Sequence, residues 1–483
     1  MARREFIEVN DFSRGVVTDV DPGDAPINSM GGCSNFMCDR PGMLYRRGGW
    51  LKVGTTVANR YPKLVAFVPD FAGASQKVWV GDNDHLFLSD GTDKGTLTVS
   101  PCNAVIYRTG GTKNILVFLG AGATPRKYTG SGAIAALGGT PPSGCTVGTV
   151  YKTRLVVGTN AANPVRTYFS PTPDIEAAWD LTNAWVDSEH PPTGYAALQN
   201  MLLVFTEFQT ERLVGTTPPP GTDFDHGVVG PVGCLDHRSI VVWRNNAIFA
   251  NAQGVYMTNG IGFRDLTAEG GVKLSWINTV ANFTGTIASC VIAGMLIVSL
   301  CDSGQNELAV FCCNLNASHP VWWYLDNFDA LHFASAYSAG LEEVYGATSK
   351  GGYMIGMHDI LIPTTNVKDG DGSSFTSAFS TQEVGHGMGL QHFGLGYLDY
   401  NLGNPSASPT YEVYIGGGRE PGGDVPESPL IKGIGMNRFT IARQARFMQM
   451  IVTQTVDSTI SEIYGYKVET RPFQPRRIDF SDV

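Results

Sequence analysis

The chain has 483 residues, of which 43% are hydrophobic and only 16% are charged, with 58 Gly and 27 Pro. This length and apolar content exclude a chain that is disordered as a whole, and they provide enough apolar surface for a large core. The charged fraction is below the usual value of about a quarter, which favours a subunit partly covered by other protein. The net charge of −10 argues against tight DNA binding through the phosphates.

The first residues, MARREFIEVNDF, contain two arginines but no apolar run of about 7–15 residues behind them, so no signal peptide is expected. No stretch approaches about 18 consecutive apolar residues, so no membrane span is expected. The nine Cys are an odd number and show no small disulfide framework. We therefore expect buried, reduced thiols and assembly in a reducing cytoplasm, with Cys312 and Cys313 on opposite faces of one strand.

Residues 1–60 form an irregular opening segment with scattered Gly and Pro. One short pattern then returns along residues 61–365: an apolar strand, a polar break, and a second strand that often ends at Gly. Its copies are residues 77–91, 114–130, 153–170, 200–215, 246–260, 294–314 and 343–356. Anchor residues at positions 78, 116, 155, 203, 248, 297 and 345 are separated by 38, 39, 48, 45, 49 and 48 residues.

A period of roughly 40–50 residues of short strands is typical of a β-propeller, in which each blade is a four-stranded sheet. A unit of this size cannot bury a core alone, so neighbouring blades must pack on one another and the ring must close. We expect six to eight blades, because seven strand pairs are visible and such rings often take one strand from outside the repeat. Only residues 173–186 are expected to form a short helix.

The run LIPTTNVKDGDGSS, residues 361–374, predicts a linker because it is rich in Pro, Gly, Asp and Ser. Residues 373–483 contain longer strands that alternate more cleanly, which indicates a β-sandwich-like module. The predicted fold is therefore all-β: a propeller over residues 61–365, an N-terminal extended clasp segment over 1–60, and a C-terminal β-sandwich-like module over 373–483.

Several short motifs could in principle bind metal. The runs DNDH (82–85) and KDGDG (368–372) place acidic residues at alternate positions, but turn chemistry explains both. His386 and His392 lie too far apart on an extended strand to share an ion, and Cys33 and Cys38 have no second Cys/His pair at a matching distance. No metal-binding residue is predicted.

Catalytic motifs are also missing from the sequence. There is no nucleophile elbow, zinc-protease helix or phosphate loop. The turn at 89–96 and the glycines of 120–125 fit hairpin connections, and Trp322, Trp323 and Tyr324 fit blade packing better than a glycan platform. We predict no catalytic or cofactor-binding residue, no cofactor and no enzyme.

Residues 11–50 resemble the opening of a group of tail proteins of tailed bacteriophages. The matching positions are Phe12, Gly15, Val17, Thr18, Pro22, Asn28, Asn35, Gly42, Leu44, Arg47, Gly48 and Trp50. A second block, from 150 to 260, looks like the propellers of such proteins. Its matching positions are Ser170, Trp179, Leu203, Phe205, Thr206, Gly233, Cys234, Arg238, Ser239, Phe249, Gly254, Val255, Tyr256 and Gly260.

This resemblance implies a structural subunit of a phage tail, located in the virion and assembled in the host cytoplasm. It implies a homo-oligomeric ring or nozzle that contacts adaptor, fibre or tip proteins, and through which genomic DNA leaves without tight binding. The alternatives are a minor tail-tip or receptor-binding propeller and a glycan-cleaving propeller enzyme, which would need paired carboxylates about 5–10 Å apart.

Overall fold

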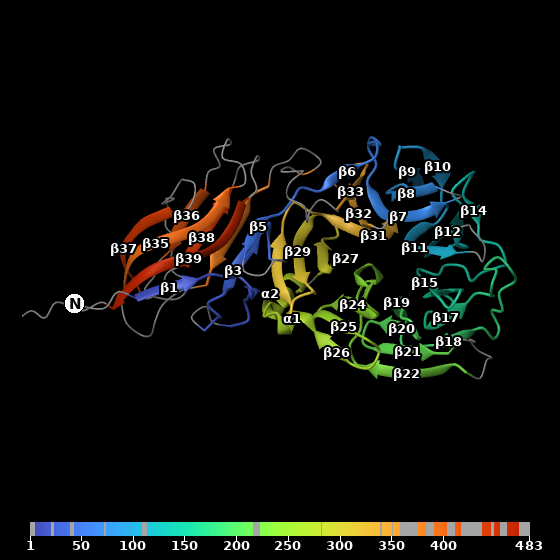
Figure 1. Ribbon diagram of the computed structural model, residues 1–483. Coiled ribbons are helices and arrows are strands. Elements are labelled where there is room, and N and C mark those ends of the chain that lie inside the picture. The colour runs from blue at the N-terminus through green and yellow to red at the C-terminus, as the bar shows by residue number, and fades with distance from the viewer. Residues whose placement is uncertain are drawn as a thin grey trace, which may run out of the picture.

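The computed structural model describes residues 5–20, 24–38, 43–71, 74–108, 114–215, 223–281, 283–338, 341–349, 351–357, 369, 375–382, 391–402, 411–416, 437–445, 449–454 and 461–472. Strands dominate this part of the chain, and they fall into a ring of small sheets beside a group of longer strands (Figure 1). The mostly-β prediction is confirmed.

The ring is built from antiparallel sheets, each assembled mainly from consecutive strands. Six of them have four strands, and a further run of four strands, β27 to β30, forms one side of a nine-stranded sheet. The first sheet consists of β7 (Pro62–Phe71), β8 (Ala74–Gly81), β9 (His85–Leu88) and β10 (Asp93–Thr96), and the second of β11 (Ser100–Arg108), β12 (Asn114–Ala121), β13 (Arg126–Tyr128) and β14 (Ala135–Ala136). The third consists of β15 (Val147–Tyr151), β16 (Arg154–Gly158), β17 (Arg166–Phe169) and β18 (Trp185–Asp187), and the fourth of β19 (Pro192–Ala197), β20 (Met201–Thr206), β21 (Thr210–Val214) and β22 (Asp225–Gly230). The fifth consists of β23 (Val241–Trp243), β24 (Asn246–Asn251), β25 (Gly254–Thr258) and β26 (Phe263–Asp265).

The ring is completed by β27 (Thr286–Ile292), β28 (Met295–Cys301), β29 (Glu307–Asn314) and β30 (Val321–Leu325), then β31 (Ala330–Ser338), β32 (Leu341–Thr348) and β33 (Met354–Gly356). The fourth strand of the last sheet is β6 (Leu51–Val53), which comes from the opening segment and pairs with β33.

The first strands of successive sheets contact one another around a common centre. β7 contacts β11, β11 contacts β15, and the contacts continue through β19, β23 and β27 to β31, which contacts β7 again. Each sequence repeat corresponds to the second and third strands of one sheet, as residues 77–91 do for β8 and β9. The fold is therefore a β-propeller, as the repeat period predicts.

Apolar side chains fill the spaces between neighbouring sheets. Between the first two sheets, for example, Leu64, Val78, Leu116 and Phe118 belong to one buried cluster. Trp322 and Trp323 are fully buried in the largest cluster, and the Trp322 indole donates to the Leu266 carbonyl at 2.9 Å. Their predicted role in blade packing is confirmed.

The helix expected over 173–186 does not form. The Asp174 carboxylate accepts the backbone N–H of Glu176, and the Asp180 carboxylate accepts those of Thr182 and Asn183. These local hydrogen bonds stabilise turns that compete with a helix. The helices are instead the short η1 (His237–Ser239), α1 (Leu266–Glu269) and α2 (Lys273–Val280).

The two ends of the chain share sheets. One sheet has the order β37 (Asn437–Ala445), β35 (Gln391–Leu402), β39 (Ser461–Pro472), β5 (Leu44–Arg46) and β4 (Phe36–Met37), and β1 (Glu5–Val9) also pairs with β39. The nine-stranded sheet continues from β30 through β2 (Gly15–Val16), β3 (Ser29–Ser34), β34 (Ser377–Thr381) and β38 (Gln449–Gln454) to β36 (Tyr411–Gly416). N-terminal strands thus pair with C-terminal strands in both sheets.

The opening segment also touches the propeller directly. Gly15 has a φ of +65°, and a Cβ atom there would lie 2.6 Å from the Trp322 carbonyl oxygen, so only glycine fits this approach of β2 to β30. Beside it, the Phe12 ring packs edge-on against Phe379 with centroids 5.5 Å apart.

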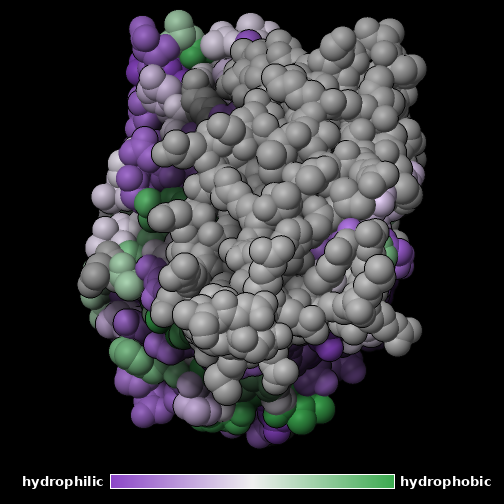
Figure 2. All heavy atoms as spheres, turned by 90° about the vertical axis from the view of Figure 1, so that its left-hand side faces the viewer, coloured by the Kyte–Doolittle hydropathy of each residue, from purple (hydrophilic) through white to green (hydrophobic). Residues whose placement is uncertain are grey.

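Figure 2 shows the face of the molecule that lies at the left of Figure 1. The described residues around its rim mix hydrophilic and hydrophobic side chains.

We predict that Cys312 and Cys313 resist thiol reagents in the native protein. Both are fully buried on β29, and burial raises the pKa of each thiol, which suppresses the reactive thiolate. Maleimide labelling followed by peptide mapping should find them unmodified before denaturation and modified in guanidinium. Rapid native labelling of both would contradict the packing described here.

Candidate functional site in the channel and at the N-terminal junction

A buried ion pair joins the opening segment to the chain beyond the propeller. Arg47 donates from Nη1 and Nη2 to the two carboxylate oxygens of Asp369 at 2.8 and 3.0 Å, and both side chains are fully buried. Asp369 also accepts the backbone N–H of Trp50 at 3.2 Å and the side-chain amide of Asn327 at 2.5 Å. We call this group the N-terminal junction, and bidentate pairing makes its geometry specific.

Asn35 places the arginine within the junction. Asn35 has a φ of +58°, a conformation that asparagine tolerates, and its Oδ1 accepts Arg47 Nε at 2.9 Å. The Asn35 amide donates to the Thr376 carbonyl at 2.7 Å and also bonds Asp326. One side chain therefore contacts the opening segment, the end of the β30 strand and the chain beyond residue 369.

An aromatic ring covers the arginines. The guanidinium carbon of Arg47 lies 3.6 Å from the centre of the Phe375 ring, and that of Arg46 lies 4.5 Å from it. Arg46 also donates to the Phe375 carbonyl at 2.9 Å. Stacking of guanidinium groups on an aromatic ring offsets part of the cost of burying their charge.

A second cluster lies where the chain enters the fifth sheet. Asp236 caps η1 and accepts Arg238 Nη2 at 2.8 Å and Nε at 3.0 Å, while His237 Nδ1 lies 3.5 Å from its carboxylate. Burial alone would raise the pKa of the Asp236 carboxyl, but the charges of Arg238 and His237 and the hydrogen bonds from Arg238 lower it. Asp236 is therefore an ionised structural partner and not a proton donor.

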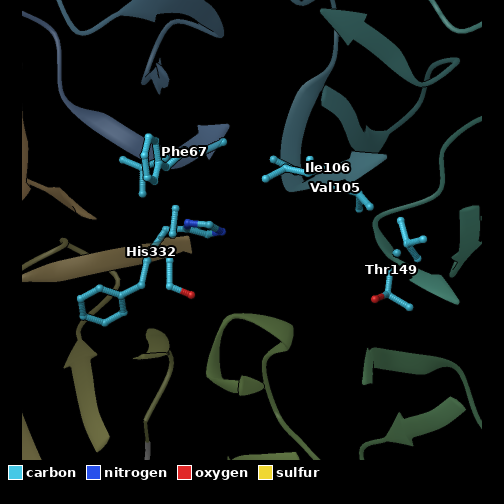
Figure 3. Close-up of a pocket in the computed structure, with 13 residues that line it drawn as sticks. Phe67, Val105, Ile106, Thr149 and His332 are labelled. Atoms are coloured by element: carbon cyan, nitrogen blue, oxygen red, sulfur yellow. The ribbon is translucent and has the colours of Figure 1, made fainter. Parts of the chain in front are cut away.

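His332 on β31 faces the same region. Burial, together with the positive charges of His237 and Arg238, lowers the pKa of His332 to about 3. Its Nδ1 atom is buried and has no hydrogen-bond partner among the described residues. The ring is thus neutral at physiological pH, and it lines a cavity of about 350 Å³ with Phe67, Ile106 and Thr149 (Figure 3).

The cavity is a section of the propeller channel. Its lining comes from the innermost strands β7, β11, β15 and β31, and the side chains labelled in Figure 3 belong to these four strands. Apart from His332, the lining residues are apolar or small and uncharged. This arrangement can hold water or a small molecule, and among the described residues the cavity lining contributes no titratable side chain other than His332 for acid–base chemistry.

The motifs considered as metal sites have other partners. In the 82–85 run, Asp84 pairs with Lys63 and His85 Nδ1 lies 2.8 Å from Asp93. In the 368–372 run, Asp369 is the partner of Arg47. Among the residues that the structure describes, no group of three or more His, Cys, Asp or Glu could hold a metal ion.

The sequence singled out two further pairs of possible metal ligands, Cys33 with Cys38 and His386 with His392. The sulfur atoms of Cys33 and Cys38 lie 3.9 Å apart, both buried, so the structure does bring this pair together. His386 lies outside the described residues, and His392 on β35 is opposite Arg471 and Gln444 in register. The turn at 89–96 joins β9 to β10 and the glycines of 120–125 join β12 to β13, as expected for hairpins.

Sequence reasoning missed the roles of His332 and Asp236. The only signal for Asp236 was its position beside Arg238 and Ser239 in the second resembling block, and nothing local marks His332. Arg47 and Trp50 were singled out, but their shared contact with Asp369 spans more than 300 residues of sequence.

No family model matches the chain, and no curated protein matches it. Similar solved structures include an ancestral GH74 enzyme, at 11% identity and a TM-score of 0.44, over 66% of this chain and 54% of that one. They also include BBS1N, crystallised in complex with ARL6DN, at 14% identity and a TM-score of 0.42, over 66% of this chain and 99% of that one. The chain spans about half the length of the GH74 enzyme, and at these TM-scores neither likeness carries an argument about function.

In the described part of the chain, no helix is both long and apolar enough to cross a membrane.

We predict that Arg47→Ala destabilises the protein by about 3–5 kcal/mol, because it leaves the Asp369 carboxylate buried without its partner. Urea denaturation followed by tryptophan fluorescence would measure the loss. The matched control is Arg264→Ala, which removes the exposed partner of Glu269 and should cost under about 1 kcal/mol. Equal effects of the two substitutions would show that the junction is not structurally important.

We predict a histidine-dependent loss of stability in acid. The folded-state pKa of His332 is lowered from 6.5 to about 3, so between these values the unfolded chain binds a proton that the folded chain does not. Stability should therefore fall as pH decreases from 6.5 towards 3, by at most about 1.4 kcal/mol per pH unit. The stability of His332→Gln should depend less steeply on pH than that of the wild type over this window, as measured by thermal melts. His85→Gln serves as the control on an outer pair of strands, and identical slopes for wild type and His332→Gln would contradict the assignment.

Proposed function

We propose that this protein is a structural subunit of a bacteriophage tail, in which copies of the chain form a ring around the path of the genome. One observation carries the proposal: residues of the N-terminal pattern that resembles tail proteins are those that hold the molecule together. Arg47 and Trp50 bind Asp369, Asn35 orients Arg47, and Gly15 allows the close approach of β2 to β30. These residues therefore hold distant segments of the fold together, which is a structural role and not a catalytic one.

The finer architecture belongs to the same proposal. We infer seven blades, the last of them completed by β6, and we infer that the opening segment acts as a clasp between the propeller and the C-terminal strands. The pairing of β6 with β33 and of β1 with β39 supports this inference. Division into an opening segment, a propeller and a C-terminal β-sandwich-like module is likewise proposed, with the opening segment contributing strands to the other two.

The conduit would lie between subunits and not inside the propeller. The channel cavity of about 350 Å³ is the size of a small-molecule site. By sequence, the seven innermost strands contain three charged residues, Lys63, Asp70 and Arg108. The net charge of −10 would then act on the outer surfaces that face the ring axis, where it would repel phosphates over about 8–10 Å at physiological salt and reduce friction for passing DNA.

The alternatives remain a tail-tip or receptor-binding propeller and, less favoured, a glycan-cleaving enzyme. The fully buried carboxylate of Asp369 and the largely buried carboxylate of Asp236 each pair with an arginine, so neither is available as a general acid. The proposal places the protein in the virion tail, after assembly in the host cytoplasm, with other tail proteins as partners and without a cofactor.

Three measurements test the proposal. The purified full-length chain should form a closed ring of fixed copy number in native mass spectrometry and negative-stain images. It should be present in a fixed, symmetric number in purified virions of the phage that encodes it. It should bind duplex DNA more weakly than about 1 μM in a filter assay at about 50 mM salt, where electrostatic contacts are strong.

A monomer that is absent from virions would refute the structural role. Sub-micromolar DNA binding would refute the non-adhesive conduit while leaving a place in the tail intact. Saturable binding of the isolated protein to host cells would favour the receptor-binding alternative.

A further inference from the structure

A second pocket opens where the fifth, sixth and seventh sheets of the ring approach one another. It has a volume of about 590 Å³, and its lining includes Trp243, Arg244, Val291, Ala293, Ser335 and Glu342. Ser335 also lines the channel cavity, so the pocket lies at one end of the same channel. Neither the resemblance to tail proteins nor the structural role described above assigns it a function.

Arg244 is positioned by its surroundings. It occupies a tight turn between β23 and β24 with φ of +46°, followed by Asn245 with φ of +60°, the geometry of a primed hairpin turn. Its guanidinium lies 4.5 Å from the centre of the Trp243 ring, and its Nη2 donates to Asn316 Oδ1 at 3.2 Å. The remaining donors of this planar group stay available to a ligand.

Glu342 is held by the turn between β27 and β28, which also contacts Asn316. Its Oε2 accepts the backbone N–H of Ala293 at 2.8 Å, while the Asn316 amide donates to the Ala293 carbonyl at 3.0 Å. Gly294 in this turn has a φ of +82°, and a Cβ atom there would lie 2.1 Å from Asn316 Nδ2. The backbone of Ala293 therefore bonds both Glu342 and Asn316, and Asn316 in turn accepts from Arg244. Arg244 and Glu342 line the same pocket.

The two charges do not neutralise each other. Within the described residues Arg244 bonds Asn316, Glu342 bonds the Ala293 backbone, and no ion pair joins the two side chains. A pre-organised positive group and a pre-organised negative group thus line one pocket, with the apolar surfaces of Trp243 and Val291 beside them. Such a pocket has a few placed polar groups on a partly apolar wall, as ligand sites do.

We propose that this pocket binds a small carboxylic acid that also carries hydrogen-bond donors. The carboxylate would pair with Arg244 in the bidentate manner that guanidinium favours, and a hydroxyl or ammonium group would donate to Glu342. The body of the ligand would lie against Trp243. The volume suits one sugar acid or a dipeptide, and these two sources share the required chemistry. The inference does not depend on a role in a phage tail.

The test is isothermal titration of the full-length protein at low salt with glucuronic acid, alanyl-alanine and their methyl esters. We expect at least one free acid to bind with a Kd of roughly 1 mM or tighter, and its ester to bind at least about tenfold more weakly. Binding of the sugar acid alone or of the dipeptide alone identifies the source. If neither acid binds at about 10 mM, the proposal is wrong.

Substitutions locate the binding. Arg244→Ala should weaken it by about ten- to hundredfold, Arg244→Lys by less, and Glu342→Gln should weaken acids with donor groups. The matched control is Lys152→Ala: Lys152 lies in the corresponding turn of the third sheet with φ of +44°, 5.4 Å from the Tyr151 ring, but does not line the pocket. Thermal melts check that each variant folds. Unchanged affinity in folded Arg244→Ala, or equal losses in Lys152→Ala, would overturn the assignment.

Discussion

The buried contact of Arg47 with Asp369 is the interaction on which the arrangement of this chain depends. It joins two segments separated by 322 residues, and both charges are fully buried. A buried ion pair of this kind contributes specificity more than net stability, because desolvation offsets most of the Coulomb attraction. Its effect is to allow only one position of the opening segment against the chain beyond the propeller, since any other leaves two unpaired charges.

The position of the opening segment in turn determines how the ring closes. After Arg47 and Trp50 bind Asp369, the next residues form β6 and pair with β33. Upstream, β2 and β3 pair with β30 and so extend one sheet of the ring towards β34 and β38. A ring that takes its last strand from the far end of the chain cannot open at that sheet without breaking these contacts.

Several charged groups of the interior have charged partners. The carboxylates of Asp369 and Asp236 pair with Arg47 and Arg238, and the buried carboxylate of Glu211 lies 2.8 Å from His226 Nε2. His332 is neutral and has no titratable partner beside it in the channel lining. The pocket of Arg244 and Glu342 differs, because its charged groups are held in place without being paired. That difference is why we propose a ligand site there.

The sequence by itself determined the all-β class, the propeller and the position of its strands, because each repeat encodes a hairpin whose two strands pair within about 20 residues and whose apolar residues alternate. It also indicated that Trp322 and Trp323 belong to the core and that the opening segment follows a distinctive pattern. Only the tertiary structure decided that Arg47 meets Asp369, that β6 completes the last sheet, that His332 lines the channel cavity, and that Arg244 and Glu342 line one pocket. Each of these depends on pairing between residues far apart in sequence, and no local period or spacing records such a partner. The helix expected over 173–186 failed for a different, local reason: the carboxylates of Asp174 and Asp180 accept backbone N–H groups two and three residues further along the chain and hold the backbone in turns.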